Sequence, residues 1–394
     1  MEKAPVKPLL AIACGGTGGH LFPGLAVAQE LLLRSCDVVL LVSPKEVDQQ
    51  AVRSLRGIKV ATLPAVGLER GRLLTFLAGS WRSIREAKKL FRQRPPQAVL
   101  AMGGFTSAPP VLAGKSCGAV TFLHESNTVP GRANRWLSHL VDHAFVGFPS
   151  AAGWLHNPNV LTTGTPVRSE FEPSDAAGAR LALGLSPQRP VLLVMGGSQG
   201  ASGINDLVLR SLPLVTNAVA DMQFLHLTGL HDFERVRAHY AAQNLKAVVR
   251  PFLTEMELAL AAATVAVSRA GASSLAELAA MRLPAILVPY PTAADNHQYY
   301  NARAFADTGA ALLMEQRNAT AEQLAASATR LVLDPSAHRA MARELVRWHA
   351  PNAAEMIAEK MVLLLKALDH GQWSQAPKLS AATKEMRHLK SVSA

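Results

Sequence analysis

Residues 9–20 read Leu-Leu-Ala-Ile-Ala-Cys-Gly-Gly-Thr-Gly-Gly-His, a short apolar run followed by a glycine loop. The same order returns at 191–201 as Val-Leu-Leu-Val-Met-Gly-Gly-Ser-Gln-Gly-Ala, and each stretch leads into a segment of helical period. Glycines let a backbone approach a phosphate closely, and the following helix offers unpaired N–H groups and the positive end of its dipole. The repeat predicts two similar α/β domains, each with an anion-binding turn at the head of a sheet.

Composition and charge limit the class of protein. A length of 394 residues is enough for two domain cores, and 49% hydrophobic but only 5% aromatic content is typical of aliphatic parallel sheets covered by helices. A net charge of +11 indicates anionic partners such as nucleotides or lipid phosphates. Nucleic acid is the weaker choice, because base-stacking and base-reading motifs are not evident. The distant cysteines, without a Cys-x-x-Cys pair, predict a reduced protein that lacks disulfides and zinc: Cys14, Cys36 and Cys117.

Apolar runs and helical periods alternate along the chain. We expect a first domain over 1–168, a proline-containing linker at about 165–190, a second domain over 185–350, a terminal helix over 354–368 and a disordered tail over 370–394. The expected strands are 8–14, 38–43, 58–63, 97–102, 119–123, 143–147, 190–195, 223–228, 247–250, 264–268, 284–288 and 310–314. The apolar stretch after Lys7 is too short for a signal peptide, and no apolar run has the length of a membrane span, so we expect neither export nor a transmembrane helix.

Two familiar nucleotide patterns fail here. Gly114-Lys115-Ser116 ends like a P-loop, but Pro109 stands at the required leading glycine. The first glycine loop has Leu21 where a dinucleotide-binding loop has its third glycine. A dehydrogenase is therefore disfavoured.

Two polar stretches of the second half follow strands, where open α/β sheets bind ligands. Residues 268–277, Ser-Arg-Ala-Gly-Ala-Ser-Ser-Leu-Ala-Glu, offer a small-residue helix start to a pyrophosphate, and Glu277 could accept two hydrogen bonds from a ribose diol. Gln298, within 295–302, could bond to adjacent sugar hydroxyls. Tight packing of 268–277 and a helix cap at Asp295 are the alternatives, and both stay open.

Two stretches of the first half lie in comparable places. His124-Glu125-Ser126-Asn127 follows the expected strand 119–123 at its carboxyl end. Arg168 ends Gly-Thr-Pro-Val-Arg at the domain junction, from where it could reach a phosphate across the cleft. A lone surface arginine is the alternative.

Taken together, these strings resemble the MurG family of N-acetylglucosaminyltransferases. The resemblance covers about 1–365 in the family's order and spacing, and it rests on GGTGGHLFPGLAVA (15–28), MGGFTSAPP (102–110), HESN (124–127), GTPVR (164–168), GGSQGA (196–201), SRAGASSLAE (268–277) and DNHQYYNA (295–302). It implies a GT-B fold, in which two Rossmann-like domains with parallel sheets face a central cleft and a terminal helix crosses back to the first domain. It also implies transfer of N-acetylglucosamine from UDP-N-acetylglucosamine to lipid I, the undecaprenyl-diphosphate-linked N-acetylmuramoyl-pentapeptide, to give lipid II for peptidoglycan.

The resemblance also implies roles for residues, carried over by position. Leu253 would offer backbone groups to uracil, Glu277 would hold the ribose, and Gln298 would bind the N-acetylglucosamine hydroxyls. The diphosphate would meet Ser198, Arg168 and the helix start Ala272, Ser273 and Ser274. The first domain would contribute Thr17, Gly18, Gly19 and Asn127. Departures at Ser126, Phe105 and Thr165, where the family often has glutamine, tyrosine and asparagine, leave the acceptor contacts less defined.

An inverting transfer is a single displacement that needs a base for the acceptor hydroxyl and positive potential for the leaving diphosphate. The chain contains no Asp-x-Asp, so we expect no essential metal and no cofactor. His20 is the first candidate base, because a helix N-terminus favours neutral imidazole. Hydrogen bonding of His20 to the loop or to the acceptor phosphate is the alternative, and Glu125 is the second candidate base.

Residues 70–94 mix apolar and basic side chains in a pattern that suits the surface of an anionic membrane. The candidate membrane residues are Leu73, Leu74, Phe76, Leu77, Trp81, Arg82 and Arg85, and a packed helix with a solvated basic face is the alternative. The expected location is peripheral, at the cytoplasmic face of the bacterial inner membrane, with cell-wall synthesis or division proteins as partners. Two other functions stay open: a GT-B transferase that glycosylates diacylglycerol, and a non-catalytic nucleotide-sugar-binding protein.

Overall fold

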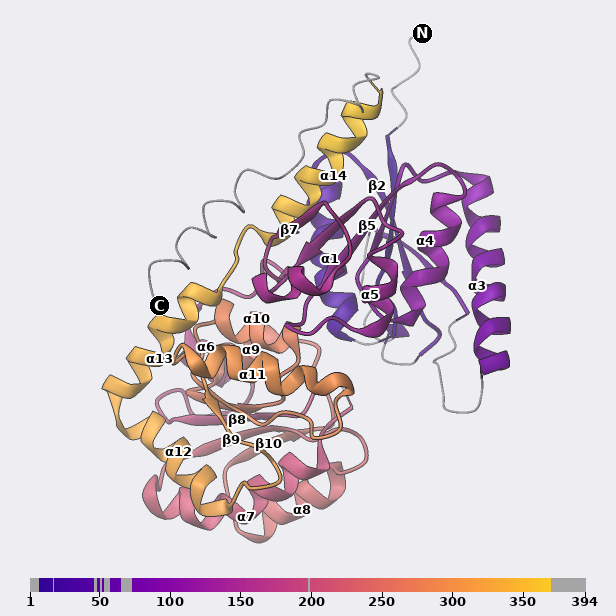
Figure 1. The fold of residues 1–394 in the computed structure, drawn as a ribbon. Coiled ribbons are helices and arrows are strands. Elements are labelled where there is room, and N and C mark those ends of the chain that lie inside the picture. Colours follow the sequence, from indigo (N-terminus) through magenta and orange to yellow (C-terminus); the bar gives the residue numbers. More distant parts are fainter. Residues whose placement is uncertain are drawn as a thin grey trace.

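The computed structural model describes residues 7–369, except 17, 46–47, 50–51, 53–56, 65–72 and 198. Within this part, the chain forms two α/β domains, each built on one parallel sheet (Figure 1). The expected tail, 370–394, lies outside the described residues. No helix in the described part is long and apolar enough to cross a bilayer.

The two sheets have the same winding. The first has the order β3-β2-β1-β4-β5-β6-β7 and the second the order β10-β9-β8-β11-β12-β13, and every neighbouring pair is parallel. In each sheet the strand order reverses beside the strand that precedes a glycine loop, β1 or β8. Ligands of open α/β sheets bind outside the carboxyl ends of the strands at such a reversal. The topology therefore places both glycine loops where ligands bind.

The first domain contains the strands β1 (Leu9–Ala13), β2 (Asp37–Val42), β3 (Lys59–Thr62), β4 (Ala98–Ala101), β5 (Val120–Glu125), β6 (His143–Val146) and β7 (Val160–Thr162). Its helices are α1 (Gly18–Leu33), α3 (Leu73–Gln93), α4 (Ala108–Lys115) and α5 (Arg132–Leu137), with the 3-10 turns η1 (Phe105–Ser107) and η2 (Pro149–Trp154).

The second domain contains the strands β8 (Val191–Met195), β9 (Gln223–Leu227), β10 (Ala247–Arg250), β11 (Val265–Ser268), β12 (Ala285–Leu287) and β13 (Leu312–Leu313). Its helices are α6 (Ala176–Ala182), α7 (Ser202–Ala218), α8 (Phe233–Ala242), α9 (Met256–Ala262), α10 (Ala272–Ala280), α11 (His297–Asp307), α12 (Ala321–Leu333) and α13 (Pro335–Trp348), with the turn η3 (Ala294–Asn296) before α11. The last helix is α14 (Ala353–Asp369).

All twelve expected strands correspond to observed ones, and two features of the layout differ from expectation. The sequence did not predict β7, a three-residue strand that pairs only with β6 at the edge of the first sheet. The stretch 165–190 is not a free linker, because it contains α6 and places Phe171, Ala179 and Leu185 in the second domain's core. The high proline content of this stretch led to the prediction of a linker, although the stretch also contains these few apolar side chains.

Alternation along β1 fills a hydrophobic layer on each face of the first sheet. Leu10 and Ile12 join one cluster, while Leu9 and Ala13 join the cluster on the opposite face. The first of these clusters also contains Ile357 and other buried side chains of α14, which leaves the second domain and lies along the first (Figure 1). The last helix therefore ties the two domains together by covering a face of the first sheet.

Candidate active site in the cleft between the domains

A cavity of about 780 Å³ lies between the domains at the carboxyl ends of both sheets. Its lining comes from both domains: the start of α1 and the loops after β4 and β5 in the first, and the segments after β8, β10 and β11, the start of α10 and the turn before α11 in the second. Ten of the predicted site residues line it: Gly18, Gly19, His20, Glu125, Asn127, Ala272, Ser273, Ser274, Glu277 and Gln298.

Four predicted substrate-binding residues are not among those lining residues. Thr17 and Ser198 lie outside the described part of the chain. Leu253 packs against the second domain's core, although Pro251 and Phe252 beside it line the cavity. Arg168 lies at the junction behind the cavity wall, where its guanidinium stacks on Phe22 and Phe171 at 5.0 and 5.1 Å from the ring centroids.

The first glycine loop is fixed by contacts that require glycine. A side chain at Gly15 would overlap the backbone of Ser43, and Gly16 has a φ of 112°. The Gly16 N–H donates to Asp48 Oδ2 at 2.6 Å, and Thr106 Oγ1 donates to the Gly15 carbonyl at 2.6 Å. Gly15 and Gly16 are therefore held in place after the carboxyl end of β1.

His20 lies in the first turn of α1, packed against Gly103 so closely that a Cβ there would be 2.8 Å from His20 Cε1. Its Nδ1 is buried without a well-formed hydrogen bond to any described residue. Burial lowers the pKa of His20, and the nearby charge of Glu125 only partly opposes this shift. The imidazole is therefore neutral near pH 7 and can accept a proton.

Glu125 ends β5 and is buried, with four N–H groups around its carboxylate. Oε1 accepts from Asn127 N at 2.8 Å and Asn127 Nδ2 at 2.9 Å, while Oε2 accepts from Gly131 N at 3.0 Å and Asn134 Nδ2 at 2.8 Å. These bonds use the acceptor capacity of both oxygens. Glu125 therefore organises the loop that leads to α5.

Glu277 lies one turn inside α10 and faces the cavity. Burial raises its pKa to about 7, against the opposing charge of Arg168, and the carboxylate of Glu257 adds to the rise. Arg168 Nη2 lies 3.9 Å from Glu257 Oε2, and Arg168 Nε is buried without a hydrogen-bond partner among the described residues. A desolvated carboxylate and a cation thus lie close together behind the start of α10.

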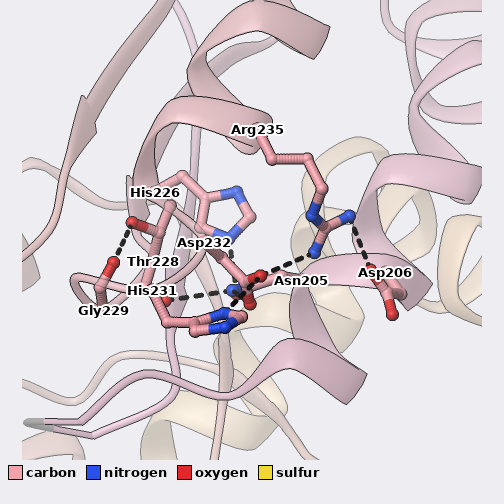
Figure 2. A network of polar contacts seen from close by, with 8 residues as sticks. All are labelled: Asn205, Asp206, His226, Thr228, Gly229, His231, Asp232 and Arg235. Atoms are coloured by element: carbon pink, nitrogen blue, oxygen red, sulfur yellow. Dashed lines mark hydrogen bonds and ion pairs between the residues drawn. The ribbon is translucent and has the colours of Figure 1, made fainter.

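The second glycine loop rests on a buried polar network, drawn in Figure 2. Asn205 Nδ2 donates to the Thr228 carbonyl at 3.0 Å and to Asp232 Oδ2 at 2.8 Å, and Asn205 Oδ1 lies 3.0 Å from His226 Nε2. Gly200 has a φ of 76°, and a side chain there would overlap the Thr228 carbonyl. The network therefore fixes the surface against which the glycine loop packs.

The domains also contact each other directly at the cavity. Thr128 N and Oγ1 both donate to Asn301 Oδ1 at 2.9 Å, and Asn301 Nδ2 donates to Asn127 Oδ1 at 3.0 Å. Ser273 Oγ donates to the Gly19 carbonyl at 2.8 Å, which joins the start of α10 to the first glycine loop. Hydrogen bonds beside the cavity therefore join the two domains in the described structure.

The outward face of α3 is apolar near its N-terminus. Leu74, Leu77 and Trp81 are 82%, 53% and 63% exposed, and the guanidinium of Arg85 stacks on Trp81 at 5.6 Å from the ring centroid. Phe76 is half-buried against Phe105, Arg82 is exposed, and the side chain of Leu73 lies outside the described residues. Towards its C-terminus, α3 buries Ala87 and Phe91 in the core.

Comparison with known proteins places the chain in a family. Residues 10–146 match the Glycosyltransferase family 28 N-terminal domain, and residues 191–360 match the Glycosyltransferase family 28 C-terminal domain. A UDP-N-acetylglucosamine–N-acetylmuramyl-(pentapeptide) pyrophosphoryl-undecaprenol N-acetylglucosamine transferase from Anaeromyxobacter sp. (strain Fw109-5) is 35% identical over 91% of this chain and 93% of its own length. The transferase of the same name from Synechocystis sp. is 36% identical over 89% and 95%.

The chain belongs to the MurG family. A crystal structure of MurG from Acinetobacter baumannii, 27% identical, covers 91% of this chain and 100% of its own chain with a TM-score of 0.69. A UDP-N-acetylglucosamine 2-epimerase from Neisseria meningitidis, 15% identical with a TM-score of 0.66, shares the fold alone. The predicted GT-B architecture and the predicted family are both confirmed.

Sequence reasoning missed Arg269 in this MurG-family site. Arg269 follows β11, lines the cavity and is buried, donating to the carbonyls of Val288 and Pro289 at 3.0 Å and to Gln316 Oε1 at 2.7 Å. Burial lowers its pKa to about 10, which leaves it charged at neutral pH. An arginine directly after a buried strand, at a ligand-binding sheet edge, was the available signal.

Asn134 and Asn301 were also missed, and no local pattern distinguishes either one.

Among the described residues, no cluster of three or more His, Cys, Asp or Glu side chains is placed to hold a metal ion.

Proposed function

We propose that this chain transfers N-acetylglucosamine from UDP-N-acetylglucosamine to lipid I, forming lipid II for peptidoglycan synthesis. The observation that carries the proposal is membership of the MurG family over nine-tenths of the chain. A cavity that joins both glycine loops supports it, because the reaction brings together two diphosphate-containing substrates.

In this proposal the donor lies mainly against the second domain. Glu277 accepts hydrogen bonds from the ribose, Gln298 binds the sugar hydroxyls, and the backbone at Leu253 meets the uracil. The start of α10 and the glycine loop after β8 hold the diphosphate. Both contribute residues to the cavity lining, and the first turn of a helix has N–H groups without partners inside the helix. Gly18, Gly19 and Asn127 approach from the first domain.

Charge on the departing diphosphate is the main electrostatic demand of the reaction. Arg269, at the cavity wall, is a buried cation whose hydrogen bonds go to uncharged oxygens, so its charge is available to a bound anion. Arg168 adds a second positive charge from behind the start of α10. Together with the helix dipoles they stabilise UDP as it leaves.

The acceptor hydroxyl attacks the anomeric carbon as the bond from that carbon to the UDP oxygen breaks, and its proton passes to a base. We assign the base to His20, because its imidazole is neutral and faces the cavity. Glu125 fits this role less well, because four N–H groups already occupy its oxygens. Its function in the proposal is to hold Asn127 and Asn134 in place.

Release of UDP from UDP-N-acetylglucosamine tests the activity, measured with a lipid I analogue, with diacylglycerol and with no acceptor. We expect release with the lipid I analogue alone. Release with diacylglycerol alone would favour a glycerolipid transferase, and donor binding without release would favour a non-catalytic binding protein. A His20→Ala variant that keeps turnover within a few-fold of the native enzyme would refute the assignment of the base.

We also propose that α3 binds the anionic cytoplasmic face of the inner membrane, which would give the first domain access to a lipid-linked acceptor. Its exposed Leu74, Leu77 and Trp81 lie on the same helix as exposed cations, the combination that interfacial segments use. Flotation with phosphatidylglycerol vesicles tests this. Trp81→Glu should abolish flotation, whereas Leu181→Glu, an equally exposed site on α6, should not. Equal flotation of both variants would refute the proposal.

A further inference from the structure

One carboxylate of the second domain lies between two guanidinium groups of the first. Asp295 is in the turn η3 before α11, and Arg132 and Arg135 are three residues apart on α5. Arg132 Nη2 lies 3.2 Å from Asp295 Oδ1, and Arg135 Nη2 contacts Asp295 Oδ2. The hydrogen bond from Arg132, together with both positive charges, holds the pKa of Asp295 below its usual value. Within the described ranges, neither arginine has a second carboxylate at ion-pairing distance.

The two arginines are not equivalent. Arg132 is 79% exposed, so water and salt screen its charge. Arg135 is only 30% exposed, and its guanidinium stacks on Trp154 at 5.5 Å from the ring centroid. The ring and the surrounding protein restrict the Arg135 side chain, which reduces the entropy lost when it pairs. The interdomain ion pair therefore depends mainly on Arg135.

The turn that carries Asp295 has a backbone conformation that needs support. Asp295 and Asn296 have φ values of 50° and 54°, in the left-handed region where non-glycine residues are strained. Asn296 N donates to the Ala293 carbonyl at 2.9 Å, and Gln298 Oε1 accepts from Tyr290 N at 3.0 Å. Gln298 follows this turn at the start of α11, and the N–H of Tyr290, before the turn, holds its carboxamide oxygen.

We propose that Asp295 is an interdomain positioning residue, whose ion pair with Arg135 closes the cleft on the sugar half of the donor and holds the turn that presents Gln298. The proposal rests on the proposed function, which places N-acetylglucosamine beside Gln298. A ligand that needs the closed form binds with an apparent affinity that is reduced by the fraction of open molecules. UDP, which is held by the second domain, does not need that closure.

Calorimetry on the full chain tests the proposal by comparing UDP-N-acetylglucosamine with UDP. Asp295→Asn keeps a residue that tolerates the left-handed region but removes the charge. We expect the Kd of UDP-N-acetylglucosamine to rise about fivefold, as for loss of a partly buried ion pair, and the Kd of UDP to stay within about twofold. Asp307→Asn is the matched control, because Asp307 pairs with Arg303 on α11 and is exposed; neither Kd should change.

A double-mutant cycle separates the ion pair from a purely structural effect. Arg135→Gln should weaken binding of UDP-N-acetylglucosamine as much as Asp295→Asn does, and the double variant should be no weaker than either single variant. Arg132→Gln should have the smaller effect. Additive effects of Asp295→Asn and Arg135→Gln, or equal losses for UDP and UDP-N-acetylglucosamine, would overturn the proposal.

Measurement of UDP release shows whether a negative result concerns the positioning role of Asp295 or the proposed transferase function. An unaltered chain that binds UDP-N-acetylglucosamine but releases no UDP with a lipid I analogue would overturn the proposed function, and the binding cycle would still measure the ion pair. Normal donor affinity of Asp295→Asn in an active transferase would overturn the positioning role alone.

Discussion

The binding of UDP-N-acetylglucosamine should depend on pH through Glu277. Burial raises the pKa of this carboxyl to about 7, so that in the free enzyme it is half protonated at neutral pH. The ionised form is the better acceptor for two ribose hydroxyls, because charge-assisted hydrogen bonds are stronger. Donor binding should therefore weaken as the pH falls through 7.

The size of the effect follows from the ionised fraction. With a pKa of about 7, roughly ten-elevenths of the carboxyl is ionised at pH 8 and about one-eleventh at pH 6. If only the carboxylate binds the ribose well, the Kd should rise about tenfold between these values. Burial lowers the pKa of His124 to about 4, so its titration does not produce this dependence.

Calorimetric titration at steps from pH 6 to pH 8 measures the effect. UDP-N-acetylglucosamine is the suitable ligand, because its diphosphate is esterified at both ends and has no proton that titrates in this range. Glu277→Gln should bind about tenfold more weakly at pH 8, the value of one lost charge-assisted hydrogen bond, and should show no dependence on pH. A native Kd that stays constant from pH 6 to pH 8 would refute the reasoning, as would an unchanged slope in Glu277→Gln.

Three further predictions concern the support of the site. Burial lowers the pKa of His226 to about 3, against 6.5 in the unfolded chain, so the unfolded state binds the proton first and the contribution of His226 to the free energy of unfolding should fall by about 3 kcal/mol between pH 6.5 and 4. Buried His124, with a pKa of about 4, adds a loss of its own over the same range. Urea denaturation of the native chain and of His226→Gln at both pH values isolates the His226 contribution, and an equal fall in the two proteins would contradict it. Gly200 has a φ of 76°, and an alanine side chain there would overlap the Thr228 carbonyl, so Gly200→Ala should lower the free energy of unfolding by more than about 1 kcal/mol. It should also weaken donor binding in calorimetry, and normal binding would argue against a role of the glycine loop in holding the donor. Asn301→Ala leaves the buried N–H and hydroxyl of Thr128 without their acceptor, so thermal unfolding should show a loss of about 2 kcal/mol, and a loss below about 0.5 kcal/mol would show that water replaces the amide.

Local sequence patterns predicted much of the fold because their physical causes are local. An apolar run followed by glycines specifies a buried strand and a turn that no bulkier residue can adopt, and this pattern marked both strands beside which the sheets reverse. Alternation of such runs with helical periods was sufficient for twelve strands. It was insufficient for β7, whose three partly exposed residues have too little apolar pattern to be distinguished from a loop.

Sequence motifs likewise predicted some residues of the candidate site but not others. Glu277, Gln298 and His20 belong to motifs that are contiguous in the sequence, and the fold brings them to one cavity. Arg269 was visible in its motif, but its burial, and hence its charge inside the cavity wall, depends on β12 and on Gln316.

The sequence by itself determined two wound α/β domains, a glycine loop at the head of each sheet, and membership of a recognisable family. Only the tertiary structure decided that Glu125 is enclosed by four N–H groups, that Leu253 packs against the second domain's core, and that Asp295 pairs with Arg135 between the domains. The reason is physical: glycine turns and apolar periods act over a few residues, whereas burial, pKa values and ion pairs depend on which distant segments the fold brings within a few ångströms.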